Sequence, residues 1–206
     1  MSFPKCLAVV LAFAFLAGCI NLKQPSYKID YFALEYEPRP VGNLKPLSHV
    51  LKVNRFRADP VYNTTQMIYR DGPFKREAYT YHKWRTNPGD LVSSLLARDI
   101  QRSGLFKAVV PHESRLSATY VLEGSVDEFL ESNRDGALQA VLTVTTTLVT
   151  AGERDMTKNI LFQKTFHATK PFKEKSPQGL AEAMSQAMAQ VSQDIIRSLY
   201  DHLKNE

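Results

Sequence analysis

The stretch ALQAVLTVTTTLVT, residues 137–150, decides the fold of this chain. Apolar side chains recur at every second position, which is the period of a β-strand with one covered face. Turn residues flank the stretch, and strand-like runs at 118–132 and 159–168 lie beyond the turns. The pattern predicts a three-stranded antiparallel meander. The residues expected on its covered face are Leu138, Ala140, Leu142, Val144 and Leu148.

Upstream of the meander, shorter runs rich in aromatic and alternating residues also have strand character. The sequence Asp71-Gly72-Pro73 separates two of these runs and predicts a hairpin between them. The proline-rich stretch 37–46 is expected to be a loop. The predicted strands are 27–35, 49–56, 66–70, 75–82 and 105–110.

Two segments have helical periodicity. Asn87 and Pro88 predict the start of a first helix, which should end at Ser103-Gly104. Ser176 and Pro177 predict a longer second helix that runs to about Leu203 and carries one apolar stripe. The stripe is expected to cover the sheet, and a lipid- or partner-binding stripe is the alternative. The expected fold class is therefore α+β, a mostly antiparallel β-sheet with two main helices packed on one face.

The N-terminal residues have the three parts of a secretory signal peptide. Lys5 gives a positive start, an apolar run follows at 6–15, and small residues stand at Ala17 and Gly18. The sequence Leu16-Ala17-Gly18-Cys19 also resembles the lipobox of bacterial lipoproteins. That resemblance implies cleavage before Cys19 and acylation of this residue. An ordinary signal peptide followed by a chance cysteine is the alternative.

The expected organisation is a signal peptide at 1–18, a lipidated tether at 19–26 and a single α+β domain at 27–206. The tether is short and polar. Fully extended, it reaches about 25–30 Å, so the folded body should lie close to the membrane that holds Cys19. The membrane is thus the first predicted partner.

Composition and motifs argue against several classes of function. The formal net charge of +5 is mild and spread along the chain, so nucleic acid is not expected as a partner. The only two cysteines are Cys6 and Cys19, and the five histidines are scattered, so neither thiol catalysis nor a metal site is expected. Asp127 and Glu128 are neighbours that a regular strand would point to opposite faces. We expect no enzymatic activity and no cofactor.

Aromatic residues gather just before the first helix. Tyr79 and Tyr81 are expected on one face of a strand, and Trp84, the only tryptophan, follows. Such residues are favoured at interfaces, so these three are candidates for a partner-binding surface. The alternative is that they roof the core where strand meets helix. Two interpretations also remain for the three lysines near residue 172: they belong to a solvated loop, or they contact membrane headgroups. These residues are Lys170, Lys173 and Lys175.

Several short motifs, in order, resemble those of the ABC-type transport auxiliary lipoproteins, the group that includes paraquat-inducible protein C. The resemblance covers nearly all of the chain after Cys19. Phe32 stands where the family's opening motif has a second tyrosine. The motifs are YFAL at 31–34, YR at 69–70, YTYHKWRTNP at 79–88, SGLFKAV at 103–109 and YVLEG at 120–124, followed by a long closing helix.

The resemblance implies a non-enzymatic outer-membrane lipoprotein that works with mammalian-cell-entry (MCE) domain proteins and ABC transporters in moving lipids or other hydrophobic molecules. Its expected task is to dock the periplasmic conduit at the outer membrane. A carrier that binds a lipid in a groove between helix and sheet is the alternative, and a periplasmic hydrolase is disfavoured by the missing catalytic motifs. The sequence is compatible with a homo-oligomer as well as with a monomer.

Overall fold

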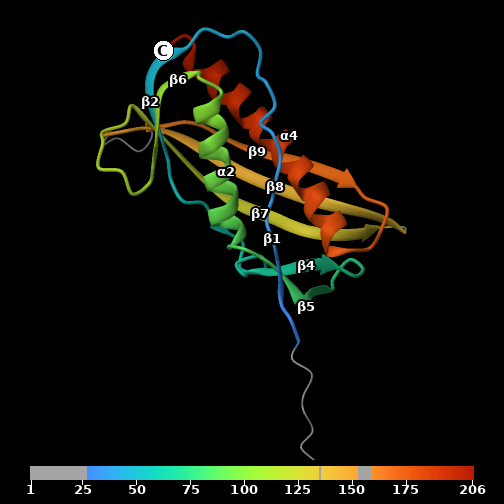
Figure 1. The fold of residues 1–206 in the computed structure, drawn as a ribbon. Coiled ribbons are helices and arrows are strands. Elements are labelled where there is room, and N and C mark those ends of the chain that lie inside the picture. The colour runs from blue at the N-terminus through green and yellow to red at the C-terminus, as the bar shows by residue number, and fades with distance from the viewer. Residues whose placement is uncertain (1–26, 135, 153–158) are drawn as a thin grey trace, which may run out of the picture.

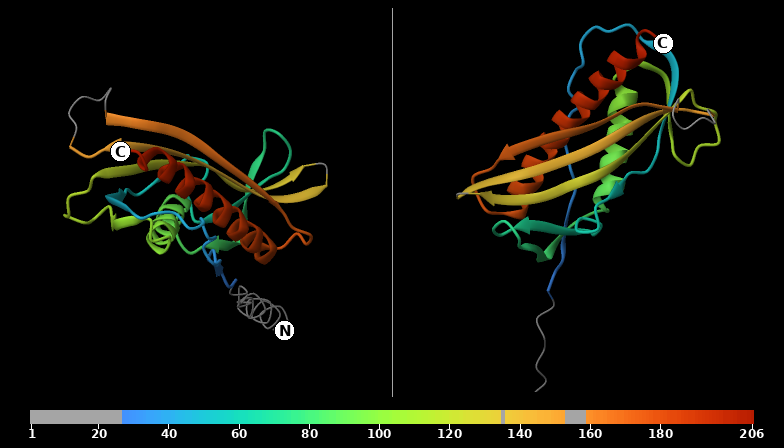
Figure 2. Two further views of the ribbon diagram at one scale, coloured as in Figure 1. Left: turned by 90° about the horizontal axis from the view of Figure 1, so that it is seen from above. Right: turned by 180° about the vertical axis from the view of Figure 1, so that it is seen from behind.

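The computed structural model describes residues 27–134, 136–152 and 159–206. The predicted signal peptide, Cys19 and the tether lie outside these residues. The described chain forms a mixed, nine-stranded sheet with two helices on one face, so the predicted fold class is confirmed (Figures 1 and 2). The strands are β1 (Asp30–Phe32), β2 (Leu47–Val53), β3 (Arg57–Ala58), β4 (Gln66–Arg70), β5 (Arg76–Trp84), β6 (Phe106–Pro111), β7 (Tyr120–Arg134), β8 (Ala137–Thr150) and β9 (Ile160–Pro171).

The meander predicted from residues 137–150 is confirmed. Strand β8 pairs in antiparallel fashion with β7 on one side and with β9 on the other, in the two longest ladders of the sheet. The turn before β8 uses Gly136 at a φ of 79°, a backbone conformation that favours glycine. Strands β4 and β5 form the hairpin expected around Asp71-Gly72-Pro73.

The sequence pattern did not predict the parallel pairs of this sheet. Strand β2 lies between β6 and β7 and is parallel to both, and β1 is parallel to β5. Parallel neighbours need a long crossover, and here the crossovers include the segment 33–46 and the first helix. The predicted strand 27–35 shrinks to Asp30–Phe32, the part that pairs with β5.

Both helices begin at the predicted caps. Helix α2 (Pro88–Arg102) starts after Asn87, whose side-chain oxygen accepts a 2.8 Å hydrogen bond from the Gly89 amide. Helix α4 (Pro177–Leu203) starts after Ser176, whose hydroxyl accepts a 3.0 Å hydrogen bond from the Gly179 amide. These bonds satisfy backbone donors that have no partner within the helix.

The apolar stripe of α4 fills the space between this helix and the sheet. Burial of each such side chain contributes about 1.5–3 kcal/mol, so the stripe is a main source of stability. The expectation that it covers the sheet is confirmed, and the alternative of a free lipid- or partner-binding stripe is wrong. Stripe residues that are 0% exposed include Leu180, Met184, Met188, Val191, Ile195 and Leu199.

The segment 33–46 runs along the outer side of the helices (Figure 1). The Tyr36 hydroxyl donates a 2.6 Å hydrogen bond to Asp99 of α2, and the Arg98 guanidinium lies over the Tyr36 ring. Burial and the Asp99 carboxylate raise the pKa of Tyr36 far above its ordinary value. The side chain of Gln193, on α4, donates a 2.7 Å hydrogen bond to the carbonyl of Pro40 in this segment. The chain that follows the tether is therefore fastened to both helices.

Candidate functional site

Trp84 lies in the hydrophobic core and is 1% exposed. Its ring meets Phe129 of β7 edge to face, with 5.1 Å between ring centroids. The structure therefore corrects the candidate role of Trp84 as a partner-binding residue. The last position of β5 points inward at the junction with α2, so the alternative that Trp84 roofs the core is the right one.

A bulge in β5 separates the two tyrosines of the predicted cluster. Between Gln66–Lys83 and Ile68–Ala78, two steps along β4 correspond to five steps along β5. The extra residues break the alternation that would have placed Tyr79 and Tyr81 side by side. Tyr79 is half-buried, whereas Tyr81 is 38% exposed.

Tyr79 belongs to a polar cluster inside the body. Its hydroxyl donates a 2.8 Å hydrogen bond to Glu131 of β7, a carboxylate that is only 1% exposed. Burial raises the pKa of Glu131 above its ordinary value, although the Tyr79 hydrogen bond and nearby Lys175 oppose the change. The Tyr69 ring lies 5.1 Å from the Tyr79 ring, and its hydroxyl donates to Glu77. Tyr79 therefore bonds to other residues of the body and stabilises the fold.

Tyr81 belongs to a different group at the end of the molecule where the tether leaves. Its ring stacks on the Tyr27 ring, with 4.8 Å between centroids. Ile29 and Tyr31 alternate with polar residues in the same N-terminal segment, and β1 places Tyr31 opposite Lys83 of β5. We name Tyr27, Ile29, Tyr31 and Tyr81 the tether-proximal aromatic surface. The four side chains are 64%, 37%, 54% and 38% exposed, respectively.

Sequence reasoning found one member of this surface and missed three. The signal was present, because Tyr27, Ile29 and Tyr31 stand at every second position. The same pattern also predicts an ordinary sheet strand over 27–35, and the pattern alone does not say which face is exposed. In the structure only three residues of it pair with β5, so the outer side of this segment remains open to solvent.

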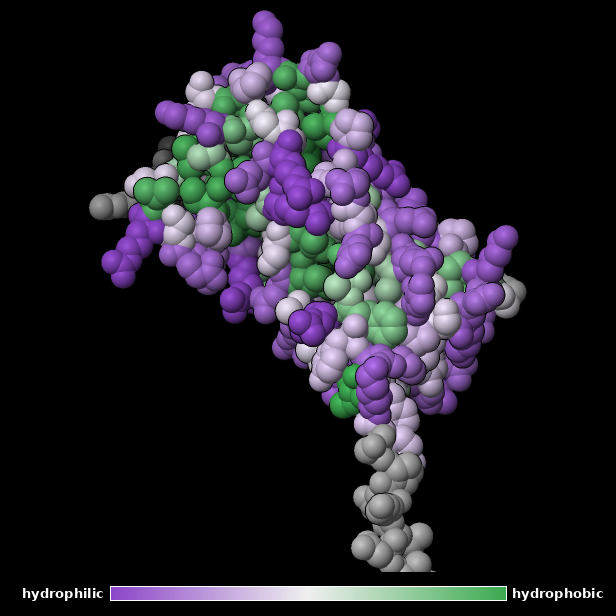
Figure 3. Space-filling view, in the orientation of Figure 1, coloured by the Kyte–Doolittle hydropathy of each residue, from purple (hydrophilic) through white to green (hydrophobic). Residues whose placement is uncertain are grey.

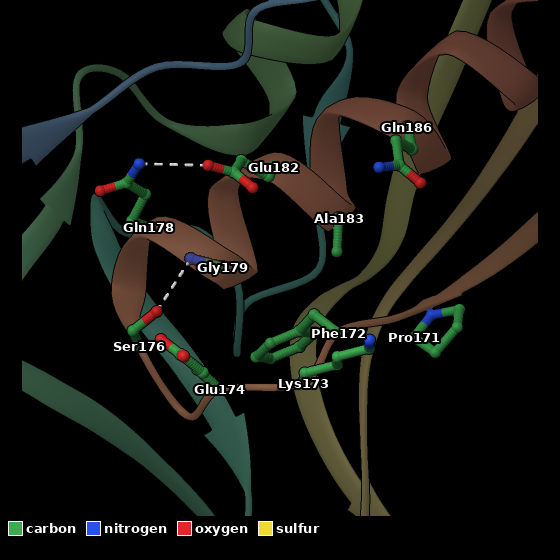
Figure 4. A pocket seen from close by; sticks show the side chains of 10 residues that line it. All are labelled: Pro171, Phe172, Lys173, Glu174, Ser176, Gln178, Gly179, Glu182, Ala183 and Gln186. Carbon is green, nitrogen blue, oxygen red and sulfur yellow. Dashed lines mark hydrogen bonds between the residues drawn. The ribbon is translucent and has the colours of Figure 1, made fainter.

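The three lysines near the end of β9 do not form one basic surface. Lys170 is a half-buried residue of β9, whereas Lys173 and Lys175 lie in the connection to α4. The Lys175 ammonium lies 5.3 Å from the centre of the Tyr69 ring. An open hollow of about 480 Å³ lies between this connection and α4, where acidic Glu174 and Glu182 balance Lys173 (Figure 4).

The face of the meander turned away from α4 is lined by hydroxyl groups. Thr145 bonds to Thr165 at 2.8 Å, and Thr143 bonds to His167 at 2.8 Å. The same threonines donate hydrogen bonds to Asp127 and Glu128. The expectation that these carboxylates point to opposite faces was wrong, because two steps along β7 match one step along β8 here.

Within 27–134, 136–152 and 159–206, no group of three histidine, cysteine, aspartate or glutamate side chains could hold a metal ion. The same residues include no helix of the length and apolar character needed to cross a membrane. The tether-proximal aromatic surface gathers four of the exposed large hydrophobic side chains of the described residues.

The fold of this chain is similar to that of several solved structures. A crystal structure of a DUF330-family protein from Xanthomonas campestris matches with a TM-score of 0.77 at 18% identity, over 85% of this chain and 97% of that one. An uncharacterized protein matches with a TM-score of 0.64 at 15% identity, over 84% and 99%. A hypothetical protein from Chlamydia trachomatis matches with a TM-score of 0.52 at 9% identity, over 78% and 100%. At these identities the similarity concerns the fold alone.

The comparison with curated proteins gave no match. The comparison with family models did: the model described as the ABC-type transport auxiliary lipoprotein component matches residues 32–196. The matched region begins in β1, ends within α4 and includes every strand between them. The match therefore spans strands β2 to β9, helix α2 and most of α4, and it agrees with the family expected from the sequence motifs. The chain belongs to the ABC-type transport auxiliary lipoprotein family.

Proposed function

We propose that this protein is a non-enzymatic subunit of an ABC transport system that moves lipids or other hydrophobic molecules through the cell envelope with an MCE-domain protein. The observation that carries the proposal is the family match over residues 32–196, behind the lipobox Leu16–Cys19. In this proposal Cys19 carries the lipid, the body faces the periplasm, and the body docks the conduit at the outer membrane.

The short tether supports a docking role. Seven residues, 20–26, separate Cys19 from Tyr27, a reach of about 25–30 Å when fully extended. A body held at this distance presents its partner-binding surfaces at a restricted height above the bilayer. A subunit that travels between membranes with its cargo would gain nothing from such a restriction.

The carrier alternative finds no support in the packing. A lipid-binding groove between helix and sheet would need an open apolar space, but the α4 stripe fills this interface with side chains that are 0% exposed. The hollow near Lys173 is open, and its lining includes several charged and amide side chains (Figure 4). Docking therefore explains the described surfaces better than cargo binding does.

The test is purification of the C-terminally tagged lipoprotein from detergent-solubilised membranes. We expect an MCE-domain protein and the components of an ABC transporter to be recovered with it. A matched Cys19→Ala variant should lack the lipid and recover much less of the complex. Recovery of stoichiometric lipid without any MCE-domain protein would instead favour a carrier.

Membrane fractionation tests the location separately. Ile20 follows the proposed lipidated cysteine, whereas inner-membrane retention in enterobacteria typically depends on aspartate at this position. We therefore expect the wild-type protein in the outer membrane. Its presence only in the inner membrane would refute this location while leaving the transport role open.

A further inference from the structure

We propose that the tether-proximal aromatic surface rests in the headgroup region of the bilayer that holds Cys19, so that the body has a fixed orientation on the membrane. The inference builds on the lipid anchor of the proposed function. It adds a second, non-covalent contact made by Tyr27, Ile29, Tyr31 and Tyr81. The first argument is exposure: among the described residues, these four are half of the eight large hydrophobic side chains that are exposed.

The second argument is position. Figure 1 shows the first described residues beside β1 and β5, and Figure 3 shows a small apolar patch among paler side chains at this same end. Tyr27 is both the first described residue and a member of the surface, stacked on Tyr81. Because only seven residues, 20–26, join Tyr27 to Cys19, this end of the body is the one that can reach the bilayer with least extension of the tether.

The third argument is chemistry. Tyrosine is enriched where membrane meets water, because its ring suits the acyl boundary while its hydroxyl remains hydrated. Lys83 is the register partner of Tyr31 in β5, and its charge can attract anionic headgroups. Lys28 lies between Tyr27 and Ile29 in the chain and forms an ion pair with Asp30 at 3.5 Å.

A protein partner is the competing occupant. The lipid surface is favoured because the tether joins the body at Tyr27, within this surface. Any protein bound here would have to fit between the body and the bilayer within the reach of the tether. The docking partner would then bind the sides of the body that face away from the membrane. The two occupants differ in whether the surface is covered in vesicles that contain lipid and this protein only.

The experiment uses the full lipoprotein in vesicles of phosphatidylethanolamine and phosphatidylglycerol. The variant Ile29→Cys is labelled at the new thiol with a polarity-sensitive fluorophore. The variant Leu116→Cys, labelled in the same way, is the matched control because Leu116 is 67% exposed in the connection between β6 and β7. Shallow spin-labelled lipids should quench the probe at 29 several-fold more than the probe at 116. Adding Tyr27→Ser and Tyr81→Ser should reduce the quenching at 29, whereas Leu116→Ser should not.

Mass spectrometry of Cys19 distinguishes failure of the proposed lipid anchor from failure of the proposed membrane-facing surface. If Cys19 carries no lipid, the proposed anchor is wrong, and this inference falls with it. If Cys19 is lipidated and both probes are quenched equally weakly, the anchor stands and the membrane-facing surface is refuted. Protection of position 29 in native membranes but not in vesicles would also refute it and would assign the surface to a protein partner.

Discussion

Tyr81 and Trp84 are three residues apart, and the fold gives them opposite roles. Trp84 is 1% exposed and packs on Phe129, whereas Tyr81 is 38% exposed and stacks on Tyr27. The identity of an aromatic residue therefore does not decide whether it stabilises the core or meets a partner. The direction of its side chain from the strand decides, and residues three positions apart in a strand point to opposite faces.

Replacing Trp84 with alanine should destabilise the body. Removing a buried tryptophan that packs on Phe129 should cost about 3–5 kcal/mol, and the melting temperature should fall by about 10 °C or more for a domain of this size. Thermal unfolding measures the loss. Tyr81→Ala is the matched control and should shift the melting temperature much less. Equal, small shifts for both variants would contradict the placement of Trp84 in the core.

Glu131 is the residue whose protonation should affect stability. Because burial raises its pKa above the ordinary 4.5, the folded state holds this proton more tightly than the unfolded chain does. The free energy of unfolding should therefore fall as pH rises from the ordinary value through the raised one. In Glu131→Gln this contribution is absent, so the stability of the variant relative to wild type should increase with pH over that window.

Chemical unfolding of both proteins across acidic to neutral pH checks this prediction. Glu123→Gln, which changes an exposed glutamate on the same strand, is the control and should leave the pH dependence unaltered. A constant difference between Glu131→Gln and wild type at every pH would show that Glu131 does not bind its proton more tightly in the folded state.

At the scale of elements, α2 docks closely on the chain between β2 and β3. A Cβ added at Gly89, in the first turn of α2, would collide with the Phe56 backbone carbonyl. The carbonyl belongs to the main chain and cannot turn aside like the end of a side chain. Glycine at 89 thus sets how near the helix can approach, and this in turn brings the helix onto the core.

Gly89→Ala should therefore be destabilising, although alanine is normally the better residue in a helix. We expect a cost of about 1–3 kcal/mol from overpacking, measured by chemical unfolding. Ser94→Ala, at an exposed position of the same helix, is the control and should be neutral or slightly stabilising. An unchanged Gly89→Ala protein would mean that α2 can shift away from Phe56 at little cost.

At the scale of the whole molecule, the N-terminal segment joins three functions in one chain. It leads from the proposed anchor, forms the tether-proximal aromatic surface and then crosses the helices, where Tyr36 binds Asp99. Any orientation imposed at the membrane is thereby transmitted to the helices and the sheet. The distance and direction of the body from the bilayer are the properties that such an arrangement controls.

Lengthening the tether should disturb that control without disturbing the fold. Inserting about 20 flexible residues after Ser26 would raise the maximum reach to roughly 100 Å, while the site lies before the first described strand. The melting temperature should be unchanged, and recovery of the transport partner from membranes should fall. A flexible replacement of 20–26 at equal length is the control and should retain the partner. Full recovery with the long tether would show that closeness to the membrane is irrelevant.

The sequence by itself determined the features that depend on neighbours along the chain. Alternation over 118–168 predicted the meander, because its strands follow one another through short turns. Asn87 and Ser176 predicted both helix starts, because a cap bonds within its own first turn. The lipobox and the ordered motifs predicted a lipoprotein of the family that the later comparison identified.

Only the tertiary structure decided the features that join distant residues. The parallel pairs of β1 with β5 and of β2 with β6 depend on where long crossovers return, and no local period encodes this. The bulges near Tyr79 and Asp127 come from register with a partner strand, so alternation alone assigned these side chains to the wrong faces. Trp84 became a core residue and Tyr27, Ile29 and Tyr31 an exposed surface for the same reason: burial depends on which strands and helices meet, and those contacts link residues far apart in the chain.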